Sequence, residues 1–325
     1  MKQPVREQPT REQPTRRLWR LLSRAFLTAL LLLIGYLVIT RLAAIDWREV
    51  ARSIADYDPL RVLLALLCVA VSYAACASYD LISRHVLGLS LPARQVAAKS
   101  FVGYAFSMNL GAMLGGMGAR YRLYSRAGVP PGDIVRLMML GSISNWVGYA
   151  LLAGILLWQV PPELITALDL PPGLLGACAI ALMSITAAYL LLCTLRRGAQ
   201  LTLRGVSVPV PRLRVALLQL TLSLLSWSAI ISALQVLMPA GIVWVETARA
   251  VAVGAVAGAV SHVPGGIGVL EYVFVEMLEG EATAAAVLAA VVVYRALYYV
   301  LPFLLALGVF GLLEYRLRGR RTQPA

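Results

Sequence analysis

Apolar stretches of membrane-spanning length are the feature of this sequence that most constrains its fold. A helix that crosses a bilayer needs roughly 20 predominantly apolar residues, and six stretches reach or nearly reach that length. They lie at 25–40, 60–82, 137–158, 173–194, 215–238 and 284–313. Because 60% of the residues are hydrophobic and only 14% are charged, a soluble globular fold is disfavoured. We therefore expect an all-α integral membrane protein, a polytopic helical bundle.

Two further apolar segments, at about 100–118 and 249–279, each contain a cluster of glycines. The clusters comprise Gly115, Gly116 and Gly118 in the first segment and Gly265, Gly266 and Gly268 in the second. Arg120 follows the first cluster and Glu271 follows the second. Unpaired backbone and charge are both costly inside a membrane and usually mark function. We therefore expect two broken helices that enter and leave the membrane on one side.

The distribution of charge predicts which side each loop faces. If both broken segments are re-entrant, most of the 29 Lys and Arg residues fall on the same side as both termini. Positively charged loops stay in the cytoplasm, so we expect six crossings and cytoplasmic termini. The order of segments then forms an inverted repeat, 25–158 and 173–313. If both segments instead crossed fully, the arginine-rich stretches 119–136 and 195–214 would lie outside.

The chain is expected to contain one membrane domain, 25–313, between two basic cytoplasmic tails at 1–24 and 314–325. The first tail contains a tandem repeat of Arg-Glu-Gln-Pro-Thr, a composition that cannot bury a core and is typical of disorder. All four cysteines lie within apolar stretches without a CxxC pair. They therefore indicate neither a disulfide nor a metal site.

The second glycine cluster predicts that a new helix begins inside the membrane. Pro264 lacks an amide N–H and ends the preceding half-helix, and the glycines allow the chain to reverse. The free amides and the positive dipole end of the new helix favour an anion such as phosphate. The first cluster offers the same arrangement, and the Arg120 guanidinium can hold two phosphate oxygens. We expect a pocket for a phospholipid headgroup, with Glu271 facing any amine.

The predicted headgroup site draws on both broken segments and on the last crossing. Its residues are Asn109, Gly115, Gly116, Gly118, Arg120, Pro264, Gly265, Gly266, Gly268, Glu271 and Arg295. His262, beside the second break, is a candidate proton relay.

Each of these residues also has a purely structural interpretation. Glycine pairs let membrane helices pack closely, and Arg120 and Glu271 can form a structural ion pair. Arg295 can pair with Glu271 or Glu276 inside the bundle, or extend outward. Asn109 and the histidine can satisfy backbone groups that the breaks leave unpaired.

The sequence lacks the motifs of several other functional classes. There is no HExxH, P-loop or GxSxG pattern, and two histidines supply a metal site or a catalytic triad poorly. The basic residues lie between apolar stretches, without the aromatic-interleaved patch that binds nucleic acid. We therefore expect no enzyme activity, no cofactor, no metal and no nucleic-acid partner.

Two segments resemble a known family. Residues 120–128 and 261–271 resemble the hallmark segments of the lysylphosphatidylglycerol synthase membrane domain, and the resemblance extends to Tyr294, Arg295 and Pro302. It covers roughly 60 to 313. By position, Arg120, the glycines of the second cluster, Glu271 and Arg295 match the family pattern.

This resemblance implies a function in lipid translocation. In the two-part enzymes of the family the membrane domain is regarded as the flippase, and a separate soluble domain transfers an aminoacyl group from tRNA to phosphatidylglycerol. The present sequence ends at Ala325, shortly after its last apolar stretch. The resemblance therefore implies a stand-alone, YbhN-like member of the bacterial inner membrane that lacks the aminoacyltransferase domain and moves lipid without synthesising it.

Four functional hypotheses remain open at this point. The leading one is a flippase for a membrane phospholipid, aminoacylated or not. The second is a carrier for another amphiphile, such as a hopanoid or an isoprenoid-linked lipid. The third is a non-transporting scaffold for a lipid-modifying enzyme, and homo-oligomers are open as well. The fourth and weakest is an intramembrane enzyme that uses Ser261 and His262.

Overall fold

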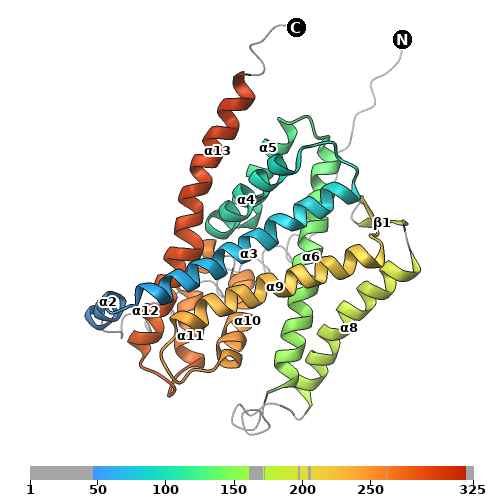
Figure 1. Cartoon of the computed structure of the whole chain (residues 1–325). Coiled ribbons are helices and arrows are strands. Elements are labelled where there is room, and N and C mark those ends of the chain that lie inside the picture. Colours follow the sequence, from blue (N-terminus) through green and yellow to red (C-terminus); the bar gives the residue numbers. More distant parts are fainter. Residues whose placement is uncertain are drawn as a thin grey trace, which may run out of the picture. The chain divides into compact units, whose positions relative to one another are not determined.

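The computed structural model describes residues 47–160, 171, 173–196, 198–203, 206–261 and 263–319. All of them belong to the second of two units into which the chain divides, Ile45–Ala325. The predicted first tail, the predicted crossing at 25–40 and His262 lie outside the described residues. What is described is almost entirely helical (Figure 1).

Helices make up nearly all of the described elements. They are α2 (Trp47–Ala55), α3 (Pro59–Val86), α4 (Ala93–Leu110), α5 (Gly118–Ser125), α6 (Pro131–Trp158), α8 (Leu174–Leu195), α9 (Leu213–Leu237), α10 (Trp244–Ser261), α11 (Val269–Met277), α12 (Ala284–Arg295) and α13 (Leu301–Gly319). Three tighter or wider helical turns interrupt them: η1 (Gly111–Met117), η2 (Pro264–Gly266) and η3 (Ala296–Val300). Two short antiparallel strands, β1 (Gln200–Leu203) and β2 (Val206–Pro209), lie within the predicted loop at 195–214.

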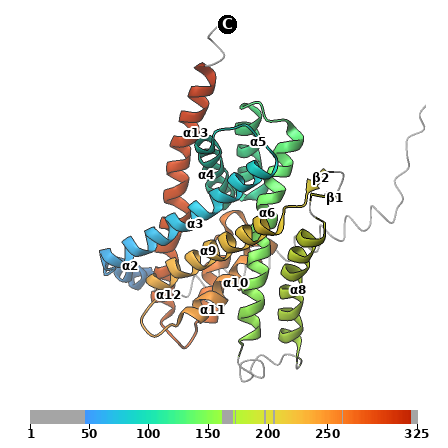
Figure 2. The same ribbon diagram turned by 45° about the vertical axis from the view of Figure 1, so that its right-hand side comes forward.

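Among the described residues, five segments are long and apolar enough to cross a membrane. They are α3, α6, α8, α9 and the continuous segment Ala284–Tyr315 that runs through α12, η3 and α13. These segments confirm the predicted crossings from 60–82 onward, so the protein is an all-α, multi-pass integral membrane protein. Figure 2 shows α6 and α8 running side by side.

Local sequence determines where these helices begin. Asp58 accepts a hydrogen bond from the Leu60 amide at 3.0 Å, and Pro59 occupies the first helical position of α3. Thr283 accepts from the Ala286 amide at 3.3 Å at the start of α12. A capping side chain satisfies an amide that has no partner within the helix, which matters more where water is scarce.

The long helices α3 and α9 pack side by side and antiparallel (Figure 1). At one end Arg61 Nη2 donates to the carbonyl of Met238, just after α9, at 2.7 Å. Further along, Ser72 Oγ lies 3.1 Å from Ser226 Oγ. Each of the two helices is followed by a broken segment, so the two broken segments start from opposite ends of the α3–α9 pair. This arrangement is consistent with the predicted inverted repeat.

The first broken segment is a helical hairpin, hereafter hairpin 1, made of α4, η1 and α5. A Cβ atom added to Gly115 would lie 2.3 Å from the Phe106 carbonyl oxygen, and one added to Gly116 would lie 2.6 Å from Ser107 Cβ. The helical turn η1, which returns along the hairpin, therefore packs directly on α4. The reversal itself occurs at Gly111, whose φ of 83° is accessible mainly to glycine.

The position of this first break differs from the prediction. The cluster Gly115, Gly116 and Gly118 was expected to form the break, but it lies beyond the turn. Gly115 and Gly116 instead permit close backbone contact, which is the packing alternative. Gly118 begins α5, and a Cβ there would meet nothing within 4 Å.

The second broken segment, hairpin 2, consists of α10, η2 and α11, and its break lies where the sequence predicts it. Gly265, Gly266 and Gly268 have φ values of 65°, 57° and 79°. Val263, which precedes Pro264, is extended, as expected for a residue before proline. The two arms touch at Gly254, where a Cβ would lie 2.7 Å from Leu270 Cδ1.

The tips of the two hairpins are in contact. A Cβ atom on Gly265 would lie 3.4 Å from the Met108 carbonyl oxygen and 3.9 Å from that of Asn109. Gly265 belongs to the turn of hairpin 2, whereas Met108 and Asn109 lie at the end of α4 in hairpin 1. Two segments that are 150 residues apart in sequence thus meet through their backbones, as expected of paired broken helices.

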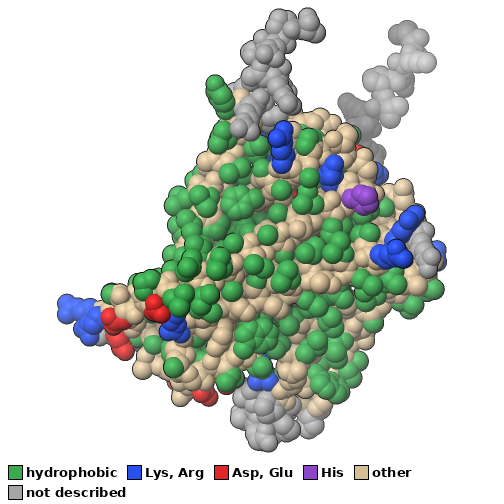
Figure 3. Space-filling view, viewed as in Figure 1, with side chains coloured by type: hydrophobic (Ala, Val, Ile, Leu, Met, Phe, Trp, Pro, Cys, Tyr) green, Lys and Arg blue, Asp and Glu red, His purple; other side chains and the backbone are tan. Residues whose placement is uncertain are grey.

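The surface suits a lipid environment. On the face formed by α3, α9 and α8, hydrophobic side chains cover much of the area, and Lys and Arg gather mainly at its margins (Figure 3). On α3 the large exposed apolar side chains are Leu60, Leu63, Leu64, Leu67 and Val71. In a bilayer such side chains face lipid tails.

Candidate functional site at two buried ion pairs

The first candidate group surrounds the guanidinium of Arg120 in α5. Its Nη2 lies 3.7 Å from Asp80 Oδ1 of α3, and its Cζ lies 4.0 Å from the centroid of the Tyr104 ring of α4. The Tyr124 hydroxyl donates to Asp80 Oδ2 at 3.1 Å. Asp80 is fully buried and Arg120 is 8% exposed. Burial of one of these charges without the other would be costly, so the pair holds hairpin 1 against α3.

Arg120 lies against α4 because its neighbour there is a glycine. A Cβ on Gly103 would lie 2.3 Å from Arg120 Nε, so any side chain at that position would displace the guanidinium. The sequence analysis did not single out Gly103.

Hydrogen-bonding capacity remains unused on this guanidinium. Arg120 Nε and Nη2 are buried and have no hydrogen-bond partner among the described residues. The 3.7 Å contact with Asp80 is an ion pair but is longer than a hydrogen bond. Buried polar groups are normally paired, so the Nε and Nη2 N–H groups are exceptions that retain capacity for an acceptor.

A buried lysine extends the polar group toward the start of hairpin 1. Lys99 of α4 is 1% exposed, and its Nζ lies 5.6 Å from the centroid of the Tyr124 ring. Gln95 Oε1 accepts a hydrogen bond from it at 3.4 Å. Burial lowers the pKa of the Lys99 amine, which lies outside the five spanning segments, to about 8. Desolvation penalises the charged form, so this amine changes charge close to physiological pH.

The second candidate group surrounds Arg295, at the end of α12. Its Nε forms an ion pair with Glu271 Oε1, and its Nη2 donates to Glu271 Oε2 at 2.9 Å. Nη1 donates to the Gly265 carbonyl and Nη2 to the Gly266 carbonyl, both at 2.7 Å. Glu271 Oε2 in turn accepts from the Gly268 amide at 2.9 Å. Arg295 thus clamps the glycine turn of hairpin 2 and the first turn of α11.

The two groups differ in what they leave unused. The Arg295 guanidinium and the Glu271 carboxylate form their hydrogen bonds within hairpin 2 and with each other. In contrast, Nε and Nη2 of Arg120 have no hydrogen-bond partner among the described residues. The predicted alternative of Glu271 as the interior partner of Arg295 is confirmed. The alternative pairing of Arg120 with Glu271 is wrong, because Arg120 pairs with Asp80.

Asn109 serves the backbone, which was the structural alternative for this residue. Its Nδ2 donates to the Ala105 carbonyl at 2.9 Å and to the Tyr299 carbonyl at 3.1 Å. Tyr299 belongs to η3, a wide helical turn in the last span. Asn109 therefore links the tip of hairpin 1 to that span. Among the residues that the structure describes, no group of three or more His, Cys, Asp or Glu could hold a metal ion.

The sequence analysis missed Asp80, although a signal was available. Asp80 is a lone carboxylate inside the predicted crossing at 60–82, and an acid in such a stretch generally has a partner and a role. Tyr104 and Tyr124 gave no such signal, because their contact with Arg120 and Asp80 exists only once hairpin 1 has folded.

Comparison with known proteins gives the family. The profile described as "Lysylphosphatidylglycerol synthase TM region" matches residues 24–306. The chain is 35% identical over 306 residues to "Inner membrane protein YbhN" of Escherichia coli (strain K12), covering 94% of this chain and 96% of the relative. It is 30% identical over 283 residues to "Uncharacterized protein slr0712" of Synechocystis sp., covering 85% of this chain and 87% of the relative.

Both the matched residues and the shared length cover most of the chain, including hairpin 1, hairpin 2 and both ion pairs. The expected resemblance is thereby confirmed. This protein belongs to the family of the lysylphosphatidylglycerol synthase TM region.

Proposed function

We propose that this protein translocates a phospholipid, aminoacylated or not, across the bacterial inner membrane, and that it does so without enzymatic chemistry. The single observation that carries the proposal is the Arg120 guanidinium, which is buried at the base of hairpin 1 and whose Nε and Nη2 have no hydrogen-bond partner among the described residues. A phosphate diester supplies the acceptor oxygens that such a group binds best. The family's description and the name of the Escherichia coli relative support a lipid-related role in that membrane.

The hairpins provide the physical means for a polar headgroup to pass. In this proposal they re-enter the bilayer from opposite sides, so the contact between their tips separates two half-channels. A bound headgroup at Arg120 would be exposed to the other side when the tip contact opens. In this scheme the lipid phosphate first contacts Arg120, because the Arg295 guanidinium is already paired with Glu271.

Reconstituted vesicles test the proposal. Fluorescent phosphatidylglycerol, its lysyl derivative and a fluorescent neutral glycolipid are incorporated symmetrically, and a membrane-impermeant quencher reports how fast each reaches the outer leaflet. The two phospholipids are expected to exchange faster with protein than without it, and the glycolipid is not. Equal acceleration of all three would contradict phosphate recognition, and acceleration of none would favour the scaffold hypothesis.

The predicted re-entrance has its own test in the intact cell membrane. In a cysteine-free background, Ser125→Cys at the end of hairpin 1 and Val243→Cys before hairpin 2 are both at exposed positions. An impermeant thiol reagent is expected to label Val243→Cys in intact spheroplasts and Ser125→Cys only in inverted vesicles. If both segments crossed fully, the two labelling patterns would be exchanged.

A further inference from the structure

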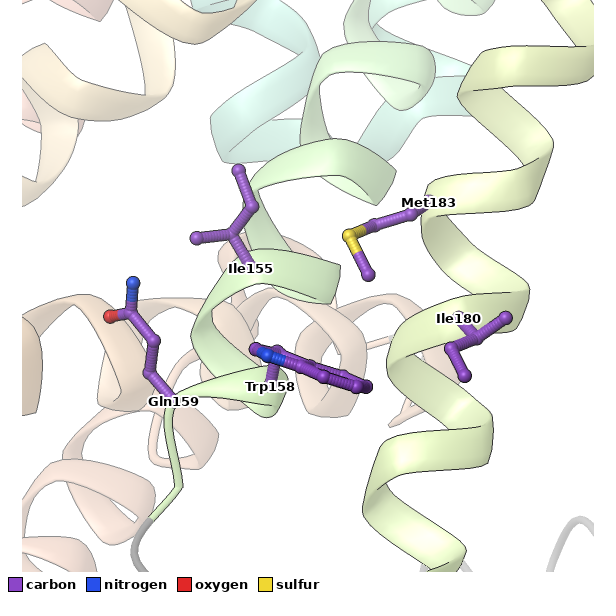
Figure 4. A pocket seen from close by; sticks show the side chains of 5 residues that line it. All are labelled: Ile155, Trp158, Gln159, Ile180 and Met183. Atoms are coloured by element: carbon purple, nitrogen blue, oxygen red, sulfur yellow. The ribbon is translucent and has the colours of Figure 1, made fainter.

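A pocket lies between the ends of two spans, away from the ion pairs. It has a volume of about 250 Å³ and is lined by Ile155, Trp158 and Gln159 of the α6 end and by Ile180 and Met183 of α8. Figure 4 shows the Trp158 ring between the two helices, with Met183 extending toward it from α8 and Gln159 at the end of α6. Trp158 is 60% exposed and Ile180 54% exposed, so the pocket opens to the surroundings of the protein.

A cation lies beside this pocket. Arg249 of α10 donates from Nη2 to the carbonyl of Gln159, one of the lining residues. Its Nε is buried and has no hydrogen-bond partner in the part of the chain that the structure describes. Of the described carboxylates, none forms an ion pair with Arg249 within 4 Å. A positive charge therefore stands at the edge of an apolar pocket without a compensating negative charge from these residues.

The position of the pocket in the membrane indicates its occupant. Both α6 and α8 are spanning segments, and the pocket lies at the end of the one and the beginning of the other. Tryptophan is favoured at the level of the lipid headgroups, which places Trp158 near an interface. A lipid there has its phosphate at the level of an arginine and its acyl chains at the level of the apolar side chains.

We infer that this pocket is a binding site for an anionic phospholipid, with one acyl chain between α6 and α8 and the phosphate at Arg249. The acyl chain gains little binding free energy in this pocket, because the surrounding lipid tails are as apolar as the pocket walls. Preference among lipids must therefore come from the polar end, where the charge of Arg249 favours a net negative headgroup. The site shares no residue with the Arg120 group and does not depend on the transport proposal.

Trp158 allows the site to be tested directly. The protein is placed in nanodiscs in which a small fraction of the lipid has brominated acyl chains, which quench tryptophan on contact. The Trp158 signal is the difference between wild type and Trp158→Phe. Brominated phosphatidylglycerol is expected to quench this signal more than brominated phosphatidylcholine at the same mole fraction. In Arg249→Gln that preference should fall about fivefold.

Two further variants make the result unambiguous. Arg61→Gln is the matched control, since Arg61 also donates to a carbonyl just after a span, that of Met238, but no residue of the pocket is involved. It should keep the wild-type preference. Arg249→Lys keeps the charge and should keep most of the preference, which separates the charge from a folding defect. Equal quenching by both lipids in wild type, or an unchanged preference in Arg249→Gln, would overturn the inference.

Discussion

An Arg120→Gln variant is expected to translocate phospholipid at least about tenfold more slowly than wild type, the effect of losing a charge-assisted hydrogen bond to phosphate. Glutamine keeps a polar side chain of moderate size but supplies neither the positive charge nor the fork of N–H donors. The measurement is the vesicle exchange assay with fluorescent phosphatidylglycerol. Arg136→Gln is the control, because Arg136 pairs with Asp133 on its own helix and should leave the rate unchanged.

A structural role of Arg120 would lower the rate as well, because Arg120→Gln leaves Asp80 buried without its counter-charge. The double variant Asp80→Asn with Arg120→Gln distinguishes the two roles, since it removes both charges together. It is expected to unfold at a higher temperature than Arg120→Gln alone while transport stays lost. Recovery of transport in the double variant would show that Arg120 serves only to balance Asp80.

An Arg295→Ala variant is expected to lose about 3–5 kcal/mol of the free energy of unfolding, more than the other variants proposed for this protein. This is the usual consequence of removing one partner of a buried ion pair. The substitution leaves the Glu271 carboxylate without its counter-charge and the carbonyls of Gly265 and Gly266 without donors. Hairpin 2 would lose the clamp on its turn. The measurement is the midpoint of thermal unfolding in detergent, followed by intrinsic fluorescence.

Arg295→Lys is the informative companion to this variant. A lysine keeps the positive charge but is a point donor without the planar fork, so it cannot make all the bonds of Arg295 at once. We expect its unfolding midpoint to lie between those of wild type and Arg295→Ala. A midpoint for Arg295→Ala equal to that of wild type would show that hairpin 2 keeps its turn without the clamp.

The contrast between the two ion pairs suggests a division of labour between the hairpins. Hairpin 2 has a fixed tip, because Arg295 and Glu271 satisfy each other and the glycine turn. At the base of hairpin 1, Arg120 makes a long ion contact with Asp80, and its Nε and Nη2 have no hydrogen-bond partner among the described residues. Hairpin 2 thus provides a rigid tip, and Arg120 of hairpin 1 provides N–H groups without a partner. This combination suits a binding site, because pre-organised groups lose less conformational entropy on binding.

The break in hairpin 2 could be predicted from the sequence because its signals are local. Pro264 cannot continue a helix, and three nearby glycines provide the positive φ values of the turn. Hairpin 1 shows the limit of such reasoning. Its sequence contains several glycines, and composition does not tell which of them adopts a positive φ and which is needed for close packing. Only the packing of the returning chain on Phe106 and Ser107 assigns these roles.

The sequence by itself determined the membrane class, five of the crossings seen here and the existence of two broken segments, because apolar length and helix-breaking residues act locally. The tertiary structure decided which charges pair. Asp80 and Arg120 lie 40 residues apart, and their contact depends on how hairpin 1 folds back against α3. The meeting of Gly265 with Met108 depends likewise on the antiparallel packing of α3 and α9, which no local pattern encodes.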